Sequence, residues 1–169
     1  MGLDTHIRRG HPITFGLLIF FGIIEGSIAT WLTTKFNRHH NYMDLSVRDR
    51  TRLLTFTSWW TVLFCAILLF LFMRTPSGAV ASVLVHLVFL SITWILWTAG
   101  AASITAALGG GINCSRVERE VTYCNQLNAL EGFAWVEWIL CTFAIFVVIV
   151  CAIRSMRRGD GARGSLVVD

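Results

Sequence analysis

Four long apolar runs dominate the chain, and short polar segments separate them. The runs cover residues 13–34, 53–73, 79–108 and 127–153. Each run has at least the roughly 20 residues that a helix needs to cross a hydrocarbon core ~30 Å thick. The runs are continuous and do not alternate between apolar and polar positions, so they predict helices and exclude a β-barrel. We therefore expect an all-α fold, a four-helix bundle integral to a membrane, with residues 1–169 forming a single domain.

The overall composition agrees with burial in lipid. Hydrophobic residues make up 55% of the chain and charged residues 14%, and the mean hydropathy is +0.65. Soluble domains carry about 25% charged residues. The net charge of +4 is scattered over the connecting segments and a short basic tail, residues 154–169. No basic stripe carries interleaved aromatic residues, so the pattern excludes nucleic acid and favours anionic lipid as a partner.

The orientation of the chain depends on two cysteines. Four spans place both termini on one side of the membrane, but the 14 Lys and Arg residues divide evenly between the two sides, so the positive-inside rule gives no answer. Cys114 and Cys124 lie in the third connecting segment with nine residues between them. They read either as a disulfide on the oxidising side of the membrane or as two free thiols in a cytosolic loop. We favour the disulfide, which places both termini in the cytosol.

Three carboxylates, Glu25, Glu131 and Glu137, fall inside the spans. A charged side chain at the bilayer centre costs roughly 2.5–3.5 kcal/mol on insertion scales, so such residues are functional candidates. Glu131 is one turn into its helix and reaches the interface, which indicates a structural role. Glu25 and Glu137 both lie some 13–15 Å below the same surface, at ~1.5 Å per residue. We expect them to share one layer, with at least one protonated and hydrogen-bonded to Ser, Thr or Trp.

Two roles remain open for the deeper carboxylate pair, a packing role and a proton relay. His86 is the one histidine inside a span, but it lies a full leaflet away from the pair, so we interpret it as a core histidine. In the first connecting segment, His39, His40 and Asp44 lack the spaced third ligand of a metal site. We therefore expect no metal.

Small residues at four-residue spacing predict close helix contacts, since such residues let helix backbones approach in lipid. The contacts either pack the four helices together or join copies of the chain. The candidates are Gly22, Gly26, Ala99, Gly100, Ser103 and Ala107.

Seven tryptophans form a second group. Tryptophan favours the membrane–water boundary, but these residues are spread over a whole half of the predicted bundle. They indicate interfacial anchoring with helix packing or, alternatively, a groove for a lipid such as a sterol. The residues are Trp31, Trp59, Trp60, Trp94, Trp97, Trp135 and Trp138.

The sequence contains no phosphate-binding loop, nucleophile elbow, zinc-protease pair or Cys-x-x-Cys motif. We therefore expect a protein that is not an enzyme and needs no cofactor.

Several short motifs resemble the fungal members of the MARVEL-domain family. They are SVRDR (46–50), WILWTAGAA (94–102), AALGGG (106–111), NCS (113–115), YCNQL (123–127), EGFAW (131–135) and RRGDG (157–161). The resemblance extends over all four spans and implies an M-shaped topology with cytosolic termini. It further implies a place in the plasma membrane or secretory vesicles, with a role in membrane apposition, vesicle trafficking or lipid microdomains.

Two functional hypotheses follow. The first is a non-enzymatic membrane organiser that self-associates, contacts lipid (sterol or sphingolipid included) and meets other membrane proteins through its helix faces. The alternative is a small transporter or channel in which Glu25 and Glu137 line a polar path.

Overall fold

A computed structural model of the chain describes residues 3–74, 83–115 and 121–157. It contains four helices, α1 (Leu3–His39), α2 (Leu45–Arg74), α3 (Val83–Leu108) and α4 (Cys124–Arg157). Each is long and apolar enough to cross a membrane, so the predicted four-helix membrane bundle is confirmed. The predicted beginning of the third span, residues 79–82, and most of the basic tail, residues 158–169, lie outside the described residues.

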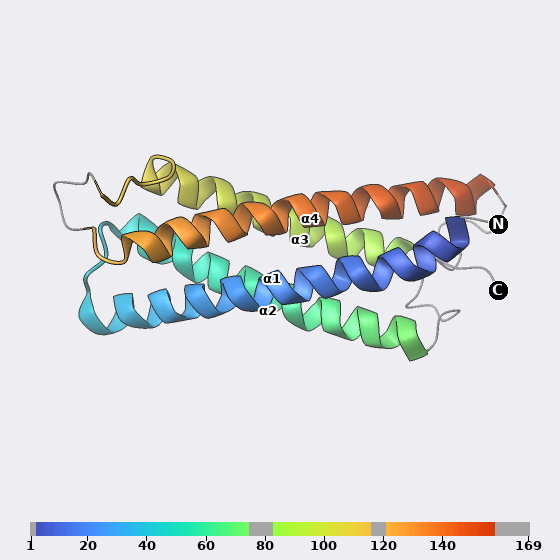
Figure 1. The fold of residues 1–169 in the computed structure, drawn as a ribbon, viewed down its shortest axis with the longest axis horizontal. Coiled ribbons are helices and arrows are strands. Elements are labelled where there is room, and N and C mark those ends of the chain that lie inside the picture. Colours follow the sequence, from blue (N-terminus) through green and yellow to red (C-terminus); the bar gives the residue numbers. More distant parts are fainter. Residues whose placement is uncertain (1–2, 75–82, 116–120, 158–169) are drawn as a thin grey trace.

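The helices run up and down along one axis (Figure 1). Contacts join α1 to α2, α2 to α3, α3 to α4 and α4 back to α1, so the helices form a closed ring of four. The α1–α2 connection and the described parts of the α3–α4 connection lie at one end, here called the disulfide end (Figure 1). The first turn of α1 and the last turn of α4 lie at the opposite end, the terminal end.

Local chemistry determines where the helices stop at the disulfide end. α1 ends as His40 takes a positive φ of 51°. α2 begins after Asp44, whose carboxylate accepts hydrogen bonds from the Leu45 amide at 2.7 Å and the Ser46 hydroxyl at 2.6 Å. α3 ends at Gly109 and Gly110, which have φ of 74° and 88°, values that favour glycine.

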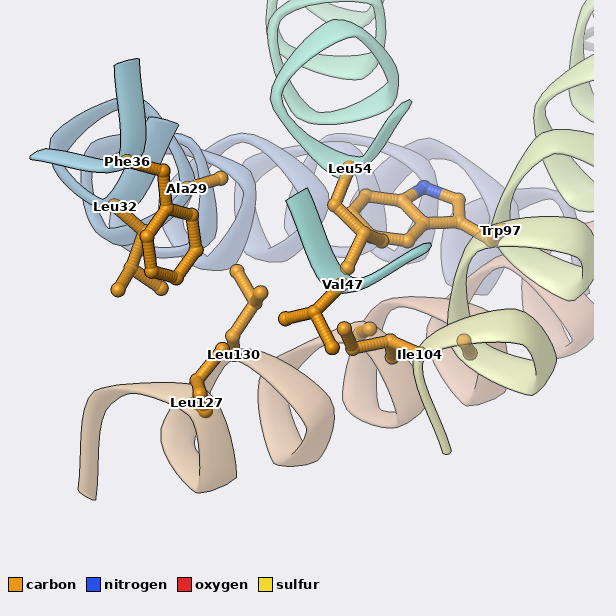
Figure 2. Close-up of a cluster of buried hydrophobic side chains, with 11 residues drawn as sticks. Ala29, Leu32, Phe36, Val47, Leu54, Trp97, Ile104, Leu127 and Leu130 are labelled. Atoms are coloured by element: carbon orange, nitrogen blue, oxygen red, sulfur yellow. The ribbon is translucent and has the colours of Figure 1, made fainter. Parts of the chain in front are cut away.

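Two apolar clusters fill the bundle, one toward each end. The disulfide-end cluster draws side chains from all four helices and includes the fully buried Trp97 (Figure 2). Its buried members are Ala29, Leu32, Phe36, Val47, Leu54, Trp97, Ala101, Ile104, Leu127, Leu130 and Ala134. The terminal-end cluster joins the four helices in the other half of the bundle. Its buried members are Phe15, Leu18, Cys65, Leu68, Phe89, Leu90, Cys141, Ala144, Val148 and Cys151.

Candidate functional site

The polar layer of the bundle consists of buried polar side chains between the two apolar clusters. Its members, all with 0% exposed surface, come from each helix: Glu25 (α1), Thr57, Ser58 and Thr61 (α2), Thr93 (α3) and Glu137 (α4). Because the membrane core has no water to satisfy such groups, their partners decide what this layer can do.

Tryptophan and threonine supply most of the polar contacts between helices. Six of the seven tryptophans donate their indole N–H to a threonine hydroxyl of a neighbouring helix, at 2.8–3.2 Å. These bonds cross three of the four seams between neighbouring helices. The pairs are Trp59–Thr30, Trp60–Thr93, Trp94–Thr142, Trp97–Thr61, Trp135–Thr105 and Trp138–Thr98.

Several of these threonines act as donor and acceptor at once. The Thr61 hydroxyl donates to the Thr57 carbonyl at 2.8 Å and accepts from Trp97 at 3.0 Å. Thr98 and Thr142 do the same with the carbonyls four residues before them. Since a hydroxyl has one donor and two acceptor positions, each is well satisfied. The six indole N–H groups therefore hold the bundle together and are not directed at a lipid ligand.

The sequence analysis did not predict these threonines as the hydrogen-bond partners of the tryptophans. A usable signal was present, because Trp on one span and Thr on the next recur at matching depths.

The seventh tryptophan, Trp31, behaves differently: its ring packs edge-on against Tyr123, with 4.9 Å between centroids, and Lys35 lies over it at 5.6 Å. Trp31 thus fits the predicted interfacial anchor.

Glu25 and Glu137 lie close enough to interact electrostatically across the bundle. Glu137 reaches the α1 backbone at Gly22: a Cβ on Gly22 would lie 3.4 Å from Glu137 Oε1. Since Gly22 is about one turn before Glu25, the two carboxyl groups occupy neighbouring turns of one layer. All four carboxyl oxygens are buried, and none has a hydrogen-bond partner among the described residues.

The expectation that one of these carboxyls bonds to Ser, Thr or Trp is therefore wrong. Two of the nearby donors are already used, because Thr61 donates to the Thr57 carbonyl and Ser58 donates to the Leu54 carbonyl. The buried Thr57 hydroxyl makes no hydrogen bond to the described residues either. The indole N–H of Trp97 goes to Thr61.

The other two predicted intramembrane polar residues lie elsewhere. His86 is fully buried in the terminal half, with its ring edge-on to Phe15 at 5.7 Å. Glu131 follows Leu130 of the disulfide-end cluster and is 9% exposed. Neither joins the carboxylate pair.

The predicted small-residue contacts divide into two groups. Gly22 and Gly26 face α2, where a Cβ would lie 3.0 Å from Val62 and 3.2 Å from Ser58. Gly100 faces the Leu54 side chain, 2.6 Å from where its Cβ would be. These three glycines are used inside the bundle and leave no face for a second copy.

The remaining small residues lie on the outside of α3. Ala99 is exposed, whereas Ser103 and Ala107 are half-buried. The exposed line continues from Ala99 through Ala102 and Ala106. We call Ala99, Ala102 and Ala106 the alanine face of α3.

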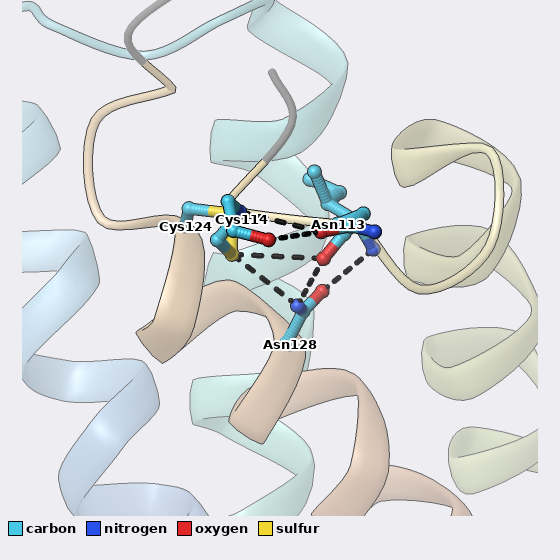
Figure 3. The surroundings of a disulfide bond; sticks show 6 residues. Asn113, Cys114, Cys124 and Asn128 are labelled. Carbon is cyan, nitrogen blue, oxygen red and sulfur yellow. Dashed lines mark hydrogen bonds between the residues drawn. A yellow bond between two sulfur atoms is a disulfide. The ribbon is translucent and has the colours of Figure 1, made fainter.

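At the disulfide end, the predicted Cys114–Cys124 disulfide links the segment after α3 to the beginning of α4, with 5.9 Å between Cα atoms (Figure 3). Asn128 on α4 fixes the same segment: its side chain accepts from the Ile112 amide at 2.9 Å and donates to the Ile112 carbonyl at 2.6 Å. A surface pocket of about 460 Å³ lies beside these residues, lined by Asn113, Ser115 and Asn125 among others. The described residues around Ile112 and Cys114 are therefore tied to the beginning of α4.

Of the three residues considered for a metal, Asp44 has another role. Asp44 caps α2, and the hydrogen bonds from the Ser46 hydroxyl and the Leu45 amide lower the pKa of its carboxyl group. Within residues 3–74, 83–115 and 121–157, no group of three His, Cys, Asp or Glu side chains is placed to hold a metal ion.

Comparison with known proteins identifies the family. A family model described as a membrane-associating domain, MARVEL, matches residues 8–147. No curated protein and no solved structure matches the chain. The match covers most of the chain and all of the polar layer described above. The chain belongs to the MARVEL family of membrane-associating domains.

Proposed function

We propose that this MARVEL protein is a non-enzymatic membrane organiser, which gathers copies of itself and selected lipids into a patch of membrane. The observation that carries this proposal is the division of polar and apolar side chains. Most described serine, threonine and tryptophan side chains of the spans bond to one another or to backbone carbonyls within the protein. Large apolar side chains face outward from every helix, among them Phe20, Phe56, Ile95 and Phe146, each at least 55% exposed.

Such a surface fits lipid contacts along the whole ring of helices. The membrane in which it acts, on this proposal, is the plasma membrane or a secretory vesicle, with the disulfide end on the oxidising side and the termini in the cytosol. Sterol and sphingolipid are the lipids we expect it to retain, and other membrane proteins are further candidates for contact.

The transporter alternative receives less support from the geometry. A path through Glu25 and Glu137 must continue to both membrane surfaces. Instead, the two apolar clusters close the bundle on either side of the polar layer, with Leu18, Leu90 and Trp97 fully buried in them. The carboxylate pair is therefore better described as an enclosed site.

Self-association, on this proposal, uses the alanine face of α3. Gly22, Gly26 and Gly100 are already occupied by contacts within the bundle. The alanine face is the small-residue surface that remains exposed, and small side chains allow two helices to approach closely in lipid. Two copies would then meet through α3 in the half of the membrane nearest the disulfide end.

The test is a pair of matched leucine variants. Ala99→Leu with Ala106→Leu adds bulk to the alanine face, whereas Ala66→Leu adds the same group to an exposed position of α2. In vesicles, single-molecule photobleaching should count more than one copy per cluster for the wild type and for A66L, and mostly one for A99L/A106L. Single copies for all three proteins, or equal loss in both variants, would contradict self-association through this face.

A further inference from the structure

Glu25 and Glu137 form an unusual pair among the buried groups of this bundle. Both side chains are fully buried, and all four carboxyl oxygens lack a hydrogen-bond partner in the described structure. Buried polar groups are normally hydrogen-bonded, so such an exception calls for an explanation. The function proposed above does not use the pair.

The spans offer no lysine or arginine to neutralise the two carboxylates. The apolar runs, residues 13–34, 53–73, 79–108 and 127–153, contain neither. The nearest basic residue on α1 is Lys35, ten residues beyond Glu25, which is about 15 Å along the helix. Buried charges in proteins are paired or become neutral.

Each helix that packs against the pair can be examined for titratable groups. On α2 the neighbour is Cys65, which interacts with Glu137, and on α4 it is Cys141, one turn beyond Glu137. The one ionisable residue of α3 is His86, which contacts Phe15, ten residues before Glu25 on α1. Thiols supply no positive charge. The pair thus faces only neutral or acidic groups.

A proton is the remaining neutralising ligand. A protonated carboxyl carries its own donor, and acceptors border this space: the Ser58 carbonyl oxygen and Glu137 Oε1 lie 3.7 and 3.4 Å from the same point, the Cβ position of Gly22. The missing side chain at Gly22 gives the Glu137 carboxyl its room. Two ionised carboxylates here would pay for desolvation and repel each other.

We propose that Glu25 and Glu137 form an enclosed proton-binding site at the centre of the bundle, which holds at least one proton at neutral pH. The site is a feature of the fold and does not depend on self-association or lipid contact. Folding then takes up protons that an unfolded chain would release near pH 4.

Infrared difference spectroscopy of the protein in bilayers at pH 7 tests this directly. The variants are Glu25→Gln and Glu137→Gln, each nearly isosteric with the neutral acid, with Asp44→Asn as the control because Asp44 is exposed and hydrogen-bonded as an anion. The difference spectra of wild type minus E25Q and of wild type minus E137Q should show the C=O stretch of a protonated carboxyl. The difference spectrum of wild type minus D44N should show a carboxylate band. Carboxylate bands for both glutamates would overturn the proposal.

A second measurement uses linkage between protonation and folding. Each retained proton lowers the folding equilibrium constant tenfold per pH unit as the pH rises between the two titrations. Between pH 5 and 7, wild type should therefore lose about 100-fold more in this constant than E25Q/E137Q, in which the histidines are unchanged. Equal slopes would show that the folded protein retains no proton at the pair, and would overturn the proposal.

Discussion

The hydrogen bonds between tryptophan and threonine allow a quantitative test of what holds the bundle together. Trp97 is fully buried and donates to Thr61 at 3.0 Å. Trp97→Phe removes the donor and part of the ring, which we expect to cost about 1–3 kcal/mol. Thr61→Val removes the acceptor but keeps the shape. Interhelical hydrogen bonds in membrane proteins contribute about 0.6 kcal/mol on average, and at most about 1.7.

A double-mutant cycle isolates the hydrogen bond from the change in volume. We expect a coupling of about 0.6–1.7 kcal/mol between W97F and T61V. A second bonded pair, Trp94 and Thr142, joined at 2.8 Å, should give a coupling in the same range. The crossed cycles, W97F with T142V and W94F with T61V, remove the same groups without a shared bond and should be additive within about 0.5 kcal/mol.

The assay is reversible unfolding in mixed lipid–detergent micelles, followed by helical circular dichroism. Each cycle is measured at one pH, so that protonation of the polar layer is constant. Coupling energies that are equal in the bonded and crossed cycles, or near zero in both bonded cycles, would refute the view that these bonds stabilise the bundle.

The remaining predictions concern single residues elsewhere in the protein. Gly22→Ala should destabilise the protein by about 1–3 kcal/mol, because the new Cβ would closely approach side chains of α2 and α4. Gly16→Ala, whose Cβ would have nothing within 4 Å, should be neutral or stabilising. Thermal unfolding compares the two variants. Because the pKa of Asp44 is lowered in the folded protein, ionised Asp44 contributes stability at pH values above the ordinary aspartate pKa. This stability is lost as the pH falls through the lowered pKa, so Asp44→Asn should flatten the acid side of a plot of Tm against pH. Cys114→Ser and Cys124→Ser should each cost about 2–3 kcal/mol, and reducing agent should destabilise wild type alone.

Sequence patterns predicted the fold because hydrophobic run length is a strong physical constraint in membranes. The Cys114–Cys124 bond was predicted from the isolation of both cysteines in one connecting segment, and the structure contains it. Counting residues from the span ends also predicted one depth for Glu25 and Glu137. In the structure, Glu137 Oε1 lies 3.4 Å from the Cβ position of Gly22, which is about one turn before Glu25.

Partner choice within a layer could not be predicted in the same way. Ser, Thr and Trp were all candidates to bond the carboxyls, and depth alone does not show which donors are already used. Threonines such as Thr61 bond to their own helix and to tryptophan. The Thr57 hydroxyl and the carboxyls of Glu25 and Glu137 have no partner among the described residues. That competition depends on side-chain rotamers and helix rotation.

Helix rotation also explains the small residues of α3. Ala99, Ser103 and Ala107 are four residues apart, so at 3.6 residues per turn each is rotated by about 40° from the one before. The line therefore turns from the lipid-facing side toward the neighbouring helices, and only Ala99 is exposed. The sequence contains this periodicity but not the angle at which α3 packs.

We propose that this MARVEL protein organises membrane by assembling with itself and with lipid. Native mass spectrometry of the full chain, extracted with its surrounding bilayer, is the decisive experiment. We expect a defined homo-oligomer that retains sterol or sphingolipid, and that loses its higher mass in A99L/A106L but not in A66L. A lone monomer without retained lipid, in the wild type, would contradict it.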